Sequence, residues 1–249
     1  TNGKVTSYSS WNDYIDYQII TKKDILEDVK TYFNQNHTKF SRKVYKRIMS
    51  ELLSLKGDKT IPIEWESSIL MKIDLENLLI TFIITGPDDT PYHNGIFVFH
   101  CCFPDNYPMS PPKVLIDNTN NNKFRWNPNL YAEGKVCLSL LGTWHADSNE
   151  SWIPGQSTLL QVITSIQCMI LGVSEPYFNE PGYEENRGTK KGDKNSKLYN
   201  NKIQYYNCYM INKMIESPIH QFEDFTKNHF LAKEEMILKN YDKWINDTE

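Results

Sequence analysis

The pattern of apolar and polar positions predicts two helices at the start of the chain, before the first strand. Thr21 and Asp24 form a capping pair, which predicts a helix running to about Gln35 with one apolar face. A second predicted helix begins at Ser41 and ends before Gly57, because apolar residues recur between them at helical spacing.

Three strand-like runs follow, over 63–70, 77–85 and 95–103, and turn chemistry separates them. Short connections between such runs are typical of an antiparallel meander. Residues 111–116 predict a fourth strand, since their two prolines stand at its start, where proline is tolerated. The predicted class is α+β, with a four-stranded antiparallel meander flanked by helices.

Residues 123–155 lose this periodicity but keep Trp126, Trp144 and Trp152, which predicts a long coil pinned by aromatic side chains. Residues 157–171 then predict a buried helix that Gly172 ends.

The remaining chain predicts a helical tail after a linker over 186–196, which is rich in lysine, glycine and asparagine. One helix ends at Ser217-Pro218, and further helical stretches include 222–225 and 236–244. We therefore expect three parts: an N-terminal extension with a helix over 1–38, a core over 39–185, and the linker with a C-terminal helical extension over 186–249.

Composition narrows the function. The 249 residues carry a net charge of -4 with mixed signs, which gives no electrostatic case for binding nucleic acid, so proteins are the expected partners. No apolar stretch reaches the length of a membrane span, so none is expected. The start at Thr1, without a signal peptide or an initiator methionine, favours a fragment or a trimmed chain.

The five cysteines are an odd number without paired metal-ligand spacing, which argues against a disulfide framework and against a zinc site. A reducing compartment, the cytoplasm or the nucleus, is therefore the expected location.

One cysteine stands out by its surroundings. Cys137 follows a turn-rich stretch and lies eight residues after Asn129. A thiol is a strong nucleophile, and a nearby amide can stabilise a tetrahedral oxyanion without acting as a base. No histidine stands beside Cys137 in the sequence, so the arrangement favours acyl transfer through a thioester.

The order of motifs resembles the ubiquitin-conjugating enzymes over roughly Phe40 to Tyr183. The motifs are Tyr107-Pro108-Met109-Ser110-Pro111-Pro112-Lys113, Asn127-Pro128-Asn129, Gly134-Lys135-Val136-Cys137-Leu138 and Trp152-Ile153-Pro154. The chain is most similar to the large subclass, which includes the conjugating domain of the giant inhibitor-of-apoptosis protein and the hybrid conjugating/ligating enzymes.

The resemblance implies a two-step acyl transfer. Cys137 would take the C-terminal carbonyl of ubiquitin, or of a ubiquitin-like protein, from the thioester of an activating enzyme and then yield it to an amine of a protein substrate. ATP is spent upstream, so no cofactor is expected on this chain. Whether a separate ligase is also a partner stays open.

The resemblance also assigns roles near the thiol. Asn129 matches the catalytic asparagine, which either donates to the oxyanion or holds the loop that positions the attack. Asn127 replaces the usual histidine of the family tripeptide and is expected to hold the turn through its own hydrogen bonds. Residues 142–151 are inserted relative to small family members. The gate that orients the incoming lysine falls near Asn179 and Glu180, which are equal candidates.

A second surface is implied for the activating enzyme and ligases. It maps to Pro108 and Met109, to Pro154 and Gly155, and to the helix over 41–55. Met109 is an adaptable apolar side chain suited to such a contact.

Three function classes stay open. The leading one is the conjugating enzyme, and the second is an inactive ubiquitin-binding variant, although such a variant typically lacks the thiol. The third is a cysteine hydrolase using His145 and Asp147, whose spacing is uninformative because triads assemble in space. We further hypothesise that the tail after Ser196 packs beside residues 175–182 and helps select the ubiquitin-like protein or the substrate.

Overall fold

The computed structural model describes residues 40–55, 61, 65–74, 77–144 and 151–246, so the helix predicted from Thr21 to Gln35 lies outside the described residues. Its sheet has four antiparallel strands in the order β1-β2-β3-β4. The strands are β1 (Ile69–Asp74), β2 (Leu79–Thr85), β3 (Ile96–Cys102) and β4 (Lys113–Ile116). The predicted α+β class and antiparallel meander are confirmed.

The first strand was predicted too early, at 63–70, whereas β1 begins at Ile69. Polar Lys72 and Asp74 interrupt the apolar run and obscured the strand in the sequence. The serines ahead of β1 are held to Thr85. Ser67 Oγ donates to Thr85 O at 2.7 Å, Ser68 N donates to Thr85 Oγ1 at 2.7 Å, and Thr85 N donates to Ser68 O at 2.9 Å.

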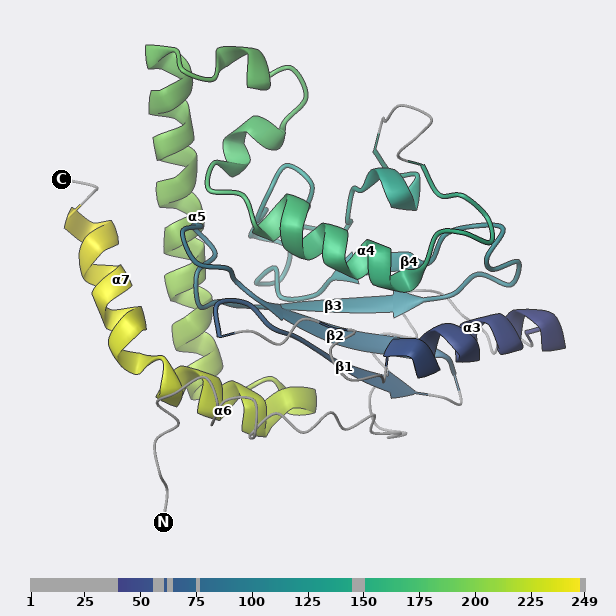
Figure 1. Cartoon of the computed structure of the whole chain (residues 1–249). Coiled ribbons are helices and arrows are strands. Elements are labelled where there is room, and N and C mark those ends of the chain that lie inside the picture. The colour runs from purple at the N-terminus through teal and green to yellow at the C-terminus, as the bar shows by residue number, and fades with distance from the viewer. Residues whose placement is uncertain (1–39, 56–60, 62–64, 75–76, 145–150, 247–249) are drawn as a thin grey trace.

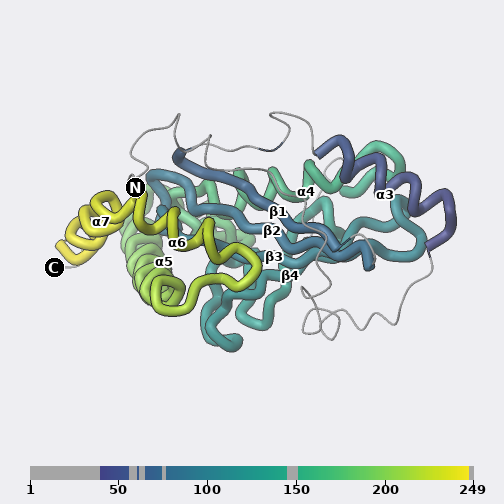
Figure 2. The backbone as a smooth tube through the Cα atoms, turned by 90° about the horizontal axis from the view of Figure 1, so that it is seen from below, coloured from purple at the N-terminus to yellow at the C-terminus, as the bar shows by residue number. Residues whose placement is uncertain are grey.

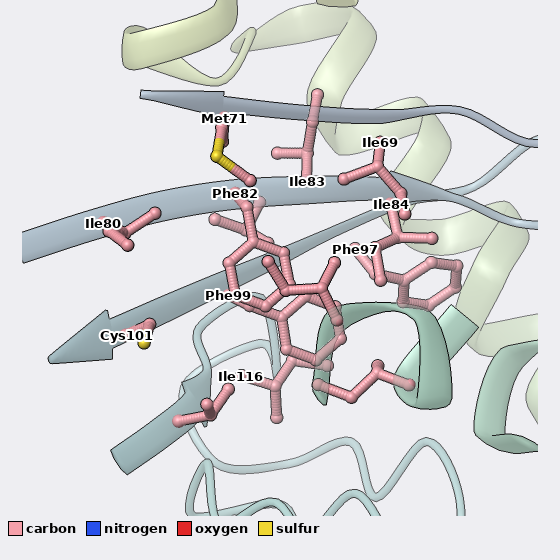
Figure 3. Close-up of a cluster of buried hydrophobic side chains, with 14 of the residues drawn as sticks. Ile69, Met71, Ile80, Phe82, Ile83, Ile84, Phe97, Phe99, Cys101 and Ile116 are labelled. Carbon is pink, nitrogen blue, oxygen red and sulfur yellow. The ribbon is translucent and has the colours of Figure 1, made fainter. Parts of the chain in front are cut away.

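Aromatic and aliphatic side chains of β2 and β3 meet in register in the core. Ile84 pairs with Phe97, Phe82 with Phe99 and Ile80 with Cys101. The Phe82 and Phe99 rings stack with centroids 5.1 Å apart. Figure 3 shows this set of side chains along the two strands. One buried cluster joins them to Leu159, Val162 and Ile163 of the helix that covers the sheet.

Two helices flank the sheet ahead of the C-terminal part. Helix α3 (Arg42–Leu55) lies at one end, and α4 (Leu159–Ser165) lies over one face (Figure 1). Thr158 begins α4 with a capping box, and the helix continues as a π-helical turn, η3 (Ile166–Leu171). Both helices were predicted, over 41–57 and 157–171.

A glycine ends this helix for a steric reason. A Cβ on Gly172 would stand 2.6 Å from the carbonyl oxygen of Cys168, so a larger residue would force the backbone apart. The predicted stop at Gly172 is confirmed.

The long connection before α4 is largely coil, apart from the short η2 (Ser139–Leu141). Trp126 is fully buried, and its Nε1 donates to Asn118 O at 3.0 Å. Trp152 Nε1 donates to Pro108 O at 2.8 Å. These indoles hold the coil as the sequence predicted, while Trp144 is half-buried.

The predicted linker over 186–196 is wrong. The short η5 (Glu184–Asn186) and then α5 (Lys190–Glu216) occupy this stretch, and the Thr189 side chain caps α5 by accepting from Gly192 N at 3.0 Å. The lysine, glycine and asparagine residues of this stretch suggested a loop, but Gly192 is needed for close packing of the backbone. A Cβ on Gly192 would lie 2.0 Å from Asn186 O, so only glycine permits this close turn.

The C-terminal helices gather at the end of the sheet away from α3. Helix α5 stands across that end, followed by α6 (Glu223–Ala232) and α7 (Glu234–Asn246) (Figures 1 and 2). The helical tail is confirmed. Ile203, Met210 and Ile211 of α5 belong to the main core, so the tail is part of one packed body. The division predicted at 38/39 and 185/186 stays a prediction.

The start of α5 packs beside residues 175–182. Past Ser196, the Tyr199 ring lies 6.2 Å from the Tyr177 ring, as the hypothesis expected, while a part of the tail in selection stays a hypothesis. Asn195 Nδ2 donates to Tyr177 Oη at 3.1 Å, and Ser196 Oγ donates to Glu175 Oε1 at 3.2 Å. Tyr177 belongs to the short η4 (Pro176–Asn179), which reaches the residues assigned to the lysine gate.

Helix α6 attaches to the sheet through buried polar groups. His229 is fully buried, and its Nε2 bonds to Asn94 O at 2.9 Å; burial, with help from Lys233, lowers its pKa to about 3. Lys233 is 1% exposed, and its ammonium donates to Trp65 O. Burial lowers the pKa of Lys233 to about 8 against the opposing effect of Asp88 and Glu66. The fold therefore keeps His229 neutral.

We expect His229 to make the fold acid-sensitive. Its pKa is about 3 in the folded chain against an ordinary 6.5, so the unfolded chain binds a proton first as pH falls. The stabilisation that comes from neutral His229 is complete above pH 6.5. Below that pH it declines, and the free energy of unfolding is lower by about 2 kcal/mol at pH 5. Urea unfolding at about pH 7.5 and 5 should show a shallower decline for His229→Gln than for the wild type. The exposed control His220→Gln should decline like the wild type, and equal slopes for all three proteins would contradict this account.

Candidate active site

A reciprocal pair of hydrogen bonds fixes Cys137 against Asn129. Cys137 N donates to Asn129 O at 2.8 Å, and Asn129 Nδ2 donates to Cys137 O at 2.9 Å. Cys137 is 1% exposed and Asn129 9%. The two residues singled out in the sequence therefore lie side by side, with the amide bound to the backbone that carries the thiol.

The chain reverses between these residues through a tight turn. Tyr131 N donates to Lys135 O and Gly134 N to Tyr131 O, each at 3.0 Å, and Leu130 bridges Val136 as an antiparallel partner. Gly134 has φ 95°, a conformation that L side chains rarely adopt. This glycine lets the run from Asn129 fold back so that Cys137 faces it.

The Asn127 amide connects this turn to the rest of the fold. Asn127 is fully buried; its Oδ1 accepts from Asn129 N at 2.9 Å, and its Nδ2 donates to Tyr92 Oη at 2.9 Å and to Ile170 O at 3.2 Å. Burial raises the pKa of Tyr92, so its hydroxyl stays protonated and donates to Trp126 O at 2.9 Å. These hydrogen bonds are the ones expected of a residue that holds the turn. A direct part for Asn127 in the chemistry stays a prediction.

Asn179 extends the same network. Its Nδ2 donates to Met169 O at 3.2 Å and contacts Asn127 Oδ1 at 3.5 Å. A chain of amide contacts thus runs from Asn179 through Asn127 and Asn129 to the backbone of Cys137.

Glu180 reaches the site by a different route, through Arg125. Glu180 Oε2 lies 3.3 Å from Arg125 Nη2, which also donates to Pro128 O at 2.8 Å. The Arg125 guanidinium stacks over the Tyr131 ring at 4.3 Å, and its charge lowers the pKa of Cys137. Arg125 was not predicted from the sequence, where its only signal is a cation two residues before Asn-Pro-Asn.

The surroundings of the thiol have opposing electrostatic effects. Burial raises the pKa of Cys137, while Lys135, Arg125 and a hydrogen bond from the Thr143 side chain lower it in part. The net pKa is raised, so the thiol form dominates at neutral pH, and the group must lose its proton as a carbonyl carbon approaches.

Thr143 is the second residue that sequence analysis missed. Its hydroxyl donates to Val136 O at 2.9 Å and accepts from Leu138 N at 3.0 Å, so it holds the backbone on both sides of Cys137. It falls at the start of the segment expected as an insertion, where no role near the thiol was predicted for it.

The surface assigned to partner proteins is separate from this network. Met109 is 66% exposed, and Pro154 and Gly155 are exposed. The bond from Trp152 to the carbonyl of Pro108 joins the two loops. The two loops are therefore in contact, and their binding of partner proteins stays a prediction.

The buried carboxylate of Glu51 ties helix α3 to this surface. It accepts from Tyr107 Oη at 2.7 Å, from Leu159 N at 2.9 Å and from Arg47 Nε at 2.6 Å. One side chain thus holds α3, the loop that contains Pro108 and the start of α4 together.

The hydrolase alternative stays open. His145 and Asp147 lie outside the described residues. In the part of the chain that the structure describes, no histidine is among the groups that shift the pKa of Cys137.

Replacement of Asn127 by leucine should destabilise the fold. Asn127→Leu keeps the approximate volume but leaves the buried Ile170 O and Asn129 N without this partner, at a cost of about 3 kcal/mol. Urea unfolding measures the loss. The exposed control Asn212→Leu should change the free energy of unfolding by no more than about 0.5 kcal/mol. Equal stabilities for the two variants would argue against Asn127 as a structural centre.

Replacement of Thr143 by valine should raise the pKa of Cys137 further, because valine lacks the hydroxyl that bonds to the thiol. The rate of Cys137 alkylation by iodoacetamide against pH, followed by peptide mass spectrometry, should shift to higher pH in Thr143→Val. The matched variant Thr143→Ser keeps the hydroxyl and should follow the wild type. A valine profile identical to the wild type would remove Thr143 from the account of the thiol.

Among the described residues, none of the helices combines the length and the apolar character needed to cross a membrane. The residues of the Cys137 turn and of the amide network all lie in a region that one sequence-family model matches. The model of the family described as ubiquitin-conjugating enzyme matches residues 47–207.

Individual relatives agree with the family match. The chain is 48% identical over 205 residues to a probable ubiquitin-conjugating enzyme of Acanthamoeba polyphaga mimivirus, with 81% of the chain covered. It is 41% identical over 206 residues to the human dual E2 ubiquitin-conjugating enzyme/E3 ubiquitin-protein ligase BIRC6, with 82% covered. It is 42% identical over 204 residues, again with 81% covered, to a probable ubiquitin-conjugating enzyme of Caenorhabditis elegans. The matched regions span only 14%, 4% and 28% of these relatives' lengths.

Proposed function

The chain belongs to the ubiquitin-conjugating enzyme family, and from that premise we propose that Cys137 carries ubiquitin, or a ubiquitin-like protein, as a thioester and yields it to a substrate lysine. The single observation that supports this most strongly is the reciprocal pairing of Cys137 with Asn129. It holds one cysteine of five in a defined orientation beside an amide donor.

The chemistry consists of two acyl transfers. In the first, the Cys137 sulfur loses its proton and attacks the thioester carbonyl carbon on the activating enzyme, whose thiolate leaves. In the second, a neutral lysine amine attacks the carbonyl carbon on Cys137. The new C–N bond forms, the amine loses a proton, and Cys137 leaves as a thiolate. Neither step changes an oxidation state, and we propose that no cofactor binds here because ATP is spent by the activating enzyme.

Asn129 suits both roles considered for it. Its amide carries two hydrogens, and the Cys137 carbonyl takes one of them. We propose that this bond positions the thiol while the amide also faces the oxyanion formed in the second step. Loss of one such donor typically lowers a rate by about a hundredfold.

The two gate candidates differ in chemistry. Glu180 is an ionisable carboxylate paired with Arg125, whereas the Asn179 amide already bonds to Met169 O. We propose that Glu180 orients the incoming lysine ammonium and that Asn179 holds the segment in place through Asn127.

The exposed surface of Met109, Pro154 and Gly155 is the proposed contact for the activating enzyme and for any ligase. Leu53 and Tyr45 are exposed apolar side chains on α3, the helix that we assign to the same contact. The human relative is named a dual conjugating enzyme and ligase, which supports a hybrid role for a longer protein containing this chain. Cytoplasmic or nuclear location likewise stays a proposal, based on cysteine usage.

A charging assay tests the proposal. Wild-type protein incubated with ubiquitin, activating enzyme and ATP should give an adduct that a thiol reductant removes on gels. Cys137→Ala should give none, because it lacks the acceptor sulfur. Cys137→Ser should give an oxyester that resists the reductant but not hydroxide. Cys168→Ala, which removes an exposed thiol, should charge like the wild type.

Three results would contradict the proposal. An adduct that persists in Cys137→Ala would place the thioester elsewhere. No adduct from folded protein with ubiquitin or its relatives would favour the inactive binding variant. Labelling of Cys137 by a ubiquitin suicide probe without activating enzyme and ATP would instead favour the hydrolase.

A further inference from the structure

One buried side chain of α5 binds the loop between β2 and β3, residues 86–95. Asn207 is 1% exposed, and its Nδ2 donates to Pro91 O at 3.3 Å and to His93 O at 3.0 Å. The approach is close, because a Cβ on Gly95 would stand 2.2 Å from Asn207 Oδ1. The carboxamide therefore lies in the space that a glycine leaves and holds the loop backbone at two points.

The residue between these two carbonyl groups is Tyr92, which connects the loop to the catalytic region. Tyr92 is fully buried, and its hydroxyl accepts from Asn127 Nδ2 and donates to Trp126 O, each at 2.9 Å. Asn127 Oδ1 accepts from Asn129 N, and Asn129 Nδ2 donates to Cys137 O. Hydrogen bonds thus run from the Tyr92 hydroxyl to the backbone that carries the thiol.

The two helices after α5 contact the same loop. His229 Nε2 of α6 bonds to Asn94 O at 2.9 Å, and Asn240 Nδ2 of α7 bonds to His93 Nδ1 at 2.6 Å. Side chains of all three C-terminal helices therefore bind this loop. Among these contacts, those of α5 lie on both sides of Tyr92.

An aromatic stack holds α5 beside the segment that leads into the active site. Tyr206, next to Asn207, stacks on the Phe124 ring with centroids 4.0 Å apart and meets the Trp126 ring edge to face at 6.0 Å. Trp126 directly precedes Asn127. The stack does not involve the Asn207 amide, so we expect α5 to stay in place when that amide is replaced.

The position of the loop matters for the reaction rate. An oxyanion donor has to lie at hydrogen-bond distance from the developing charge, and a misplacement of about 1 Å can lower a rate about a hundredfold. Asn207 binds the carbonyl groups on both sides of Tyr92, so it limits how far the Tyr92 hydroxyl moves. The proposed oxyanion contact of Asn129 belongs to the second acyl transfer, so the first transfer should depend less on Asn207.

We infer that Asn207 is a positioning residue for the second acyl transfer, because it fixes the loop that carries Tyr92 and, through the Asn127 amide, the catalytic region. This inference rests on the proposed thioester function and gives the C-terminal extension a part in the rate of that reaction. Asn207 acts through Tyr92 and takes no part in bond making.

Single-turnover discharge tests the inference. Full-length protein is charged with ubiquitin, the activating enzyme is quenched, and discharge to free lysine is followed. Asn207→Leu keeps the approximate volume but removes both donors. It should slow discharge about tenfold, while the rate of charging stays within about twofold of the wild type. Asn207→Ser has too short a side chain to bond both carbonyl groups. It should act in the same direction, and it replaces the leucine variant if that variant does not fold.

A double-mutant cycle tests the route through Tyr92. Tyr92→Phe removes the hydroxyl that binds Asn127 and should itself slow discharge. In that background Asn207→Leu should slow discharge by no more than about twofold further, because the connection is already broken. A merely structural role for Asn207 would give the full loss in both backgrounds.

Two controls on the same helix separate positioning from stability. Asn212→Leu makes the same substitution at an exposed position and should discharge like the wild type. Met214→Ala truncates a buried side chain two helical turns beyond Asn207. It should unfold at lower urea concentration, yet the folded variant should discharge at the wild-type rate.

Three results would overturn the inference. The first is wild-type discharge by the folded Asn207 variants, and the second is equal slowing of charging and discharge, which would indicate general damage to the site. The third is a double-mutant cycle in which the two losses multiply. Failure of the wild type to charge at all is a different outcome, because it removes the proposed function itself.

Discussion

The buried amide of Asn127 is the constraint on which the catalytic region depends. It satisfies a backbone donor of the Cys137 turn, a backbone acceptor at the end of the π-helical turn and a buried tyrosine hydroxyl at once. A fully buried polar group is stable only when its hydrogen bonds are made, so these three elements keep one relative arrangement. The thiol is thereby positioned from the core of the protein.

The helix formed by α4 and η3 links the two functional regions mechanically. At its start, Leu159 N donates to the Glu51 carboxylate, which also holds α3 and Tyr107 of the partner surface. At its end, Ile170 O accepts from Asn127 in the active-site network. Both ends of one rigid element are thus fixed by buried side chains, one in each region.

Local pattern was enough to predict the sheet, the flanking helices and the pair Cys137 and Asn129, because alternation, capping and turn residues act over a few positions. It placed β1 too early because Lys72 and Asp74 interrupt the apolar run. It read the start of α5 as a linker because the role of Gly192 depends on the close approach of Asn186 O. Arg125 and Thr143 were missed for the same reason, since their significance arises only where the fold brings them beside the thiol.

The raised pKa of Cys137 has a consequence for how such a protein avoids unwanted reactions. A thiol that is 1% exposed and largely protonated reacts slowly with general electrophiles in solution. Lys135, Arg125 and Thr143 counter the burial only in part, and in the proposed function the bound partner supplies the rest of the activation. An approaching thioester displaces water and presents the carbonyl carbon at short range, where even a small thiolate fraction suffices because the reactants are already oriented. The environment of Cys137 is therefore better suited to exchange within a protein complex than to attack on free small molecules.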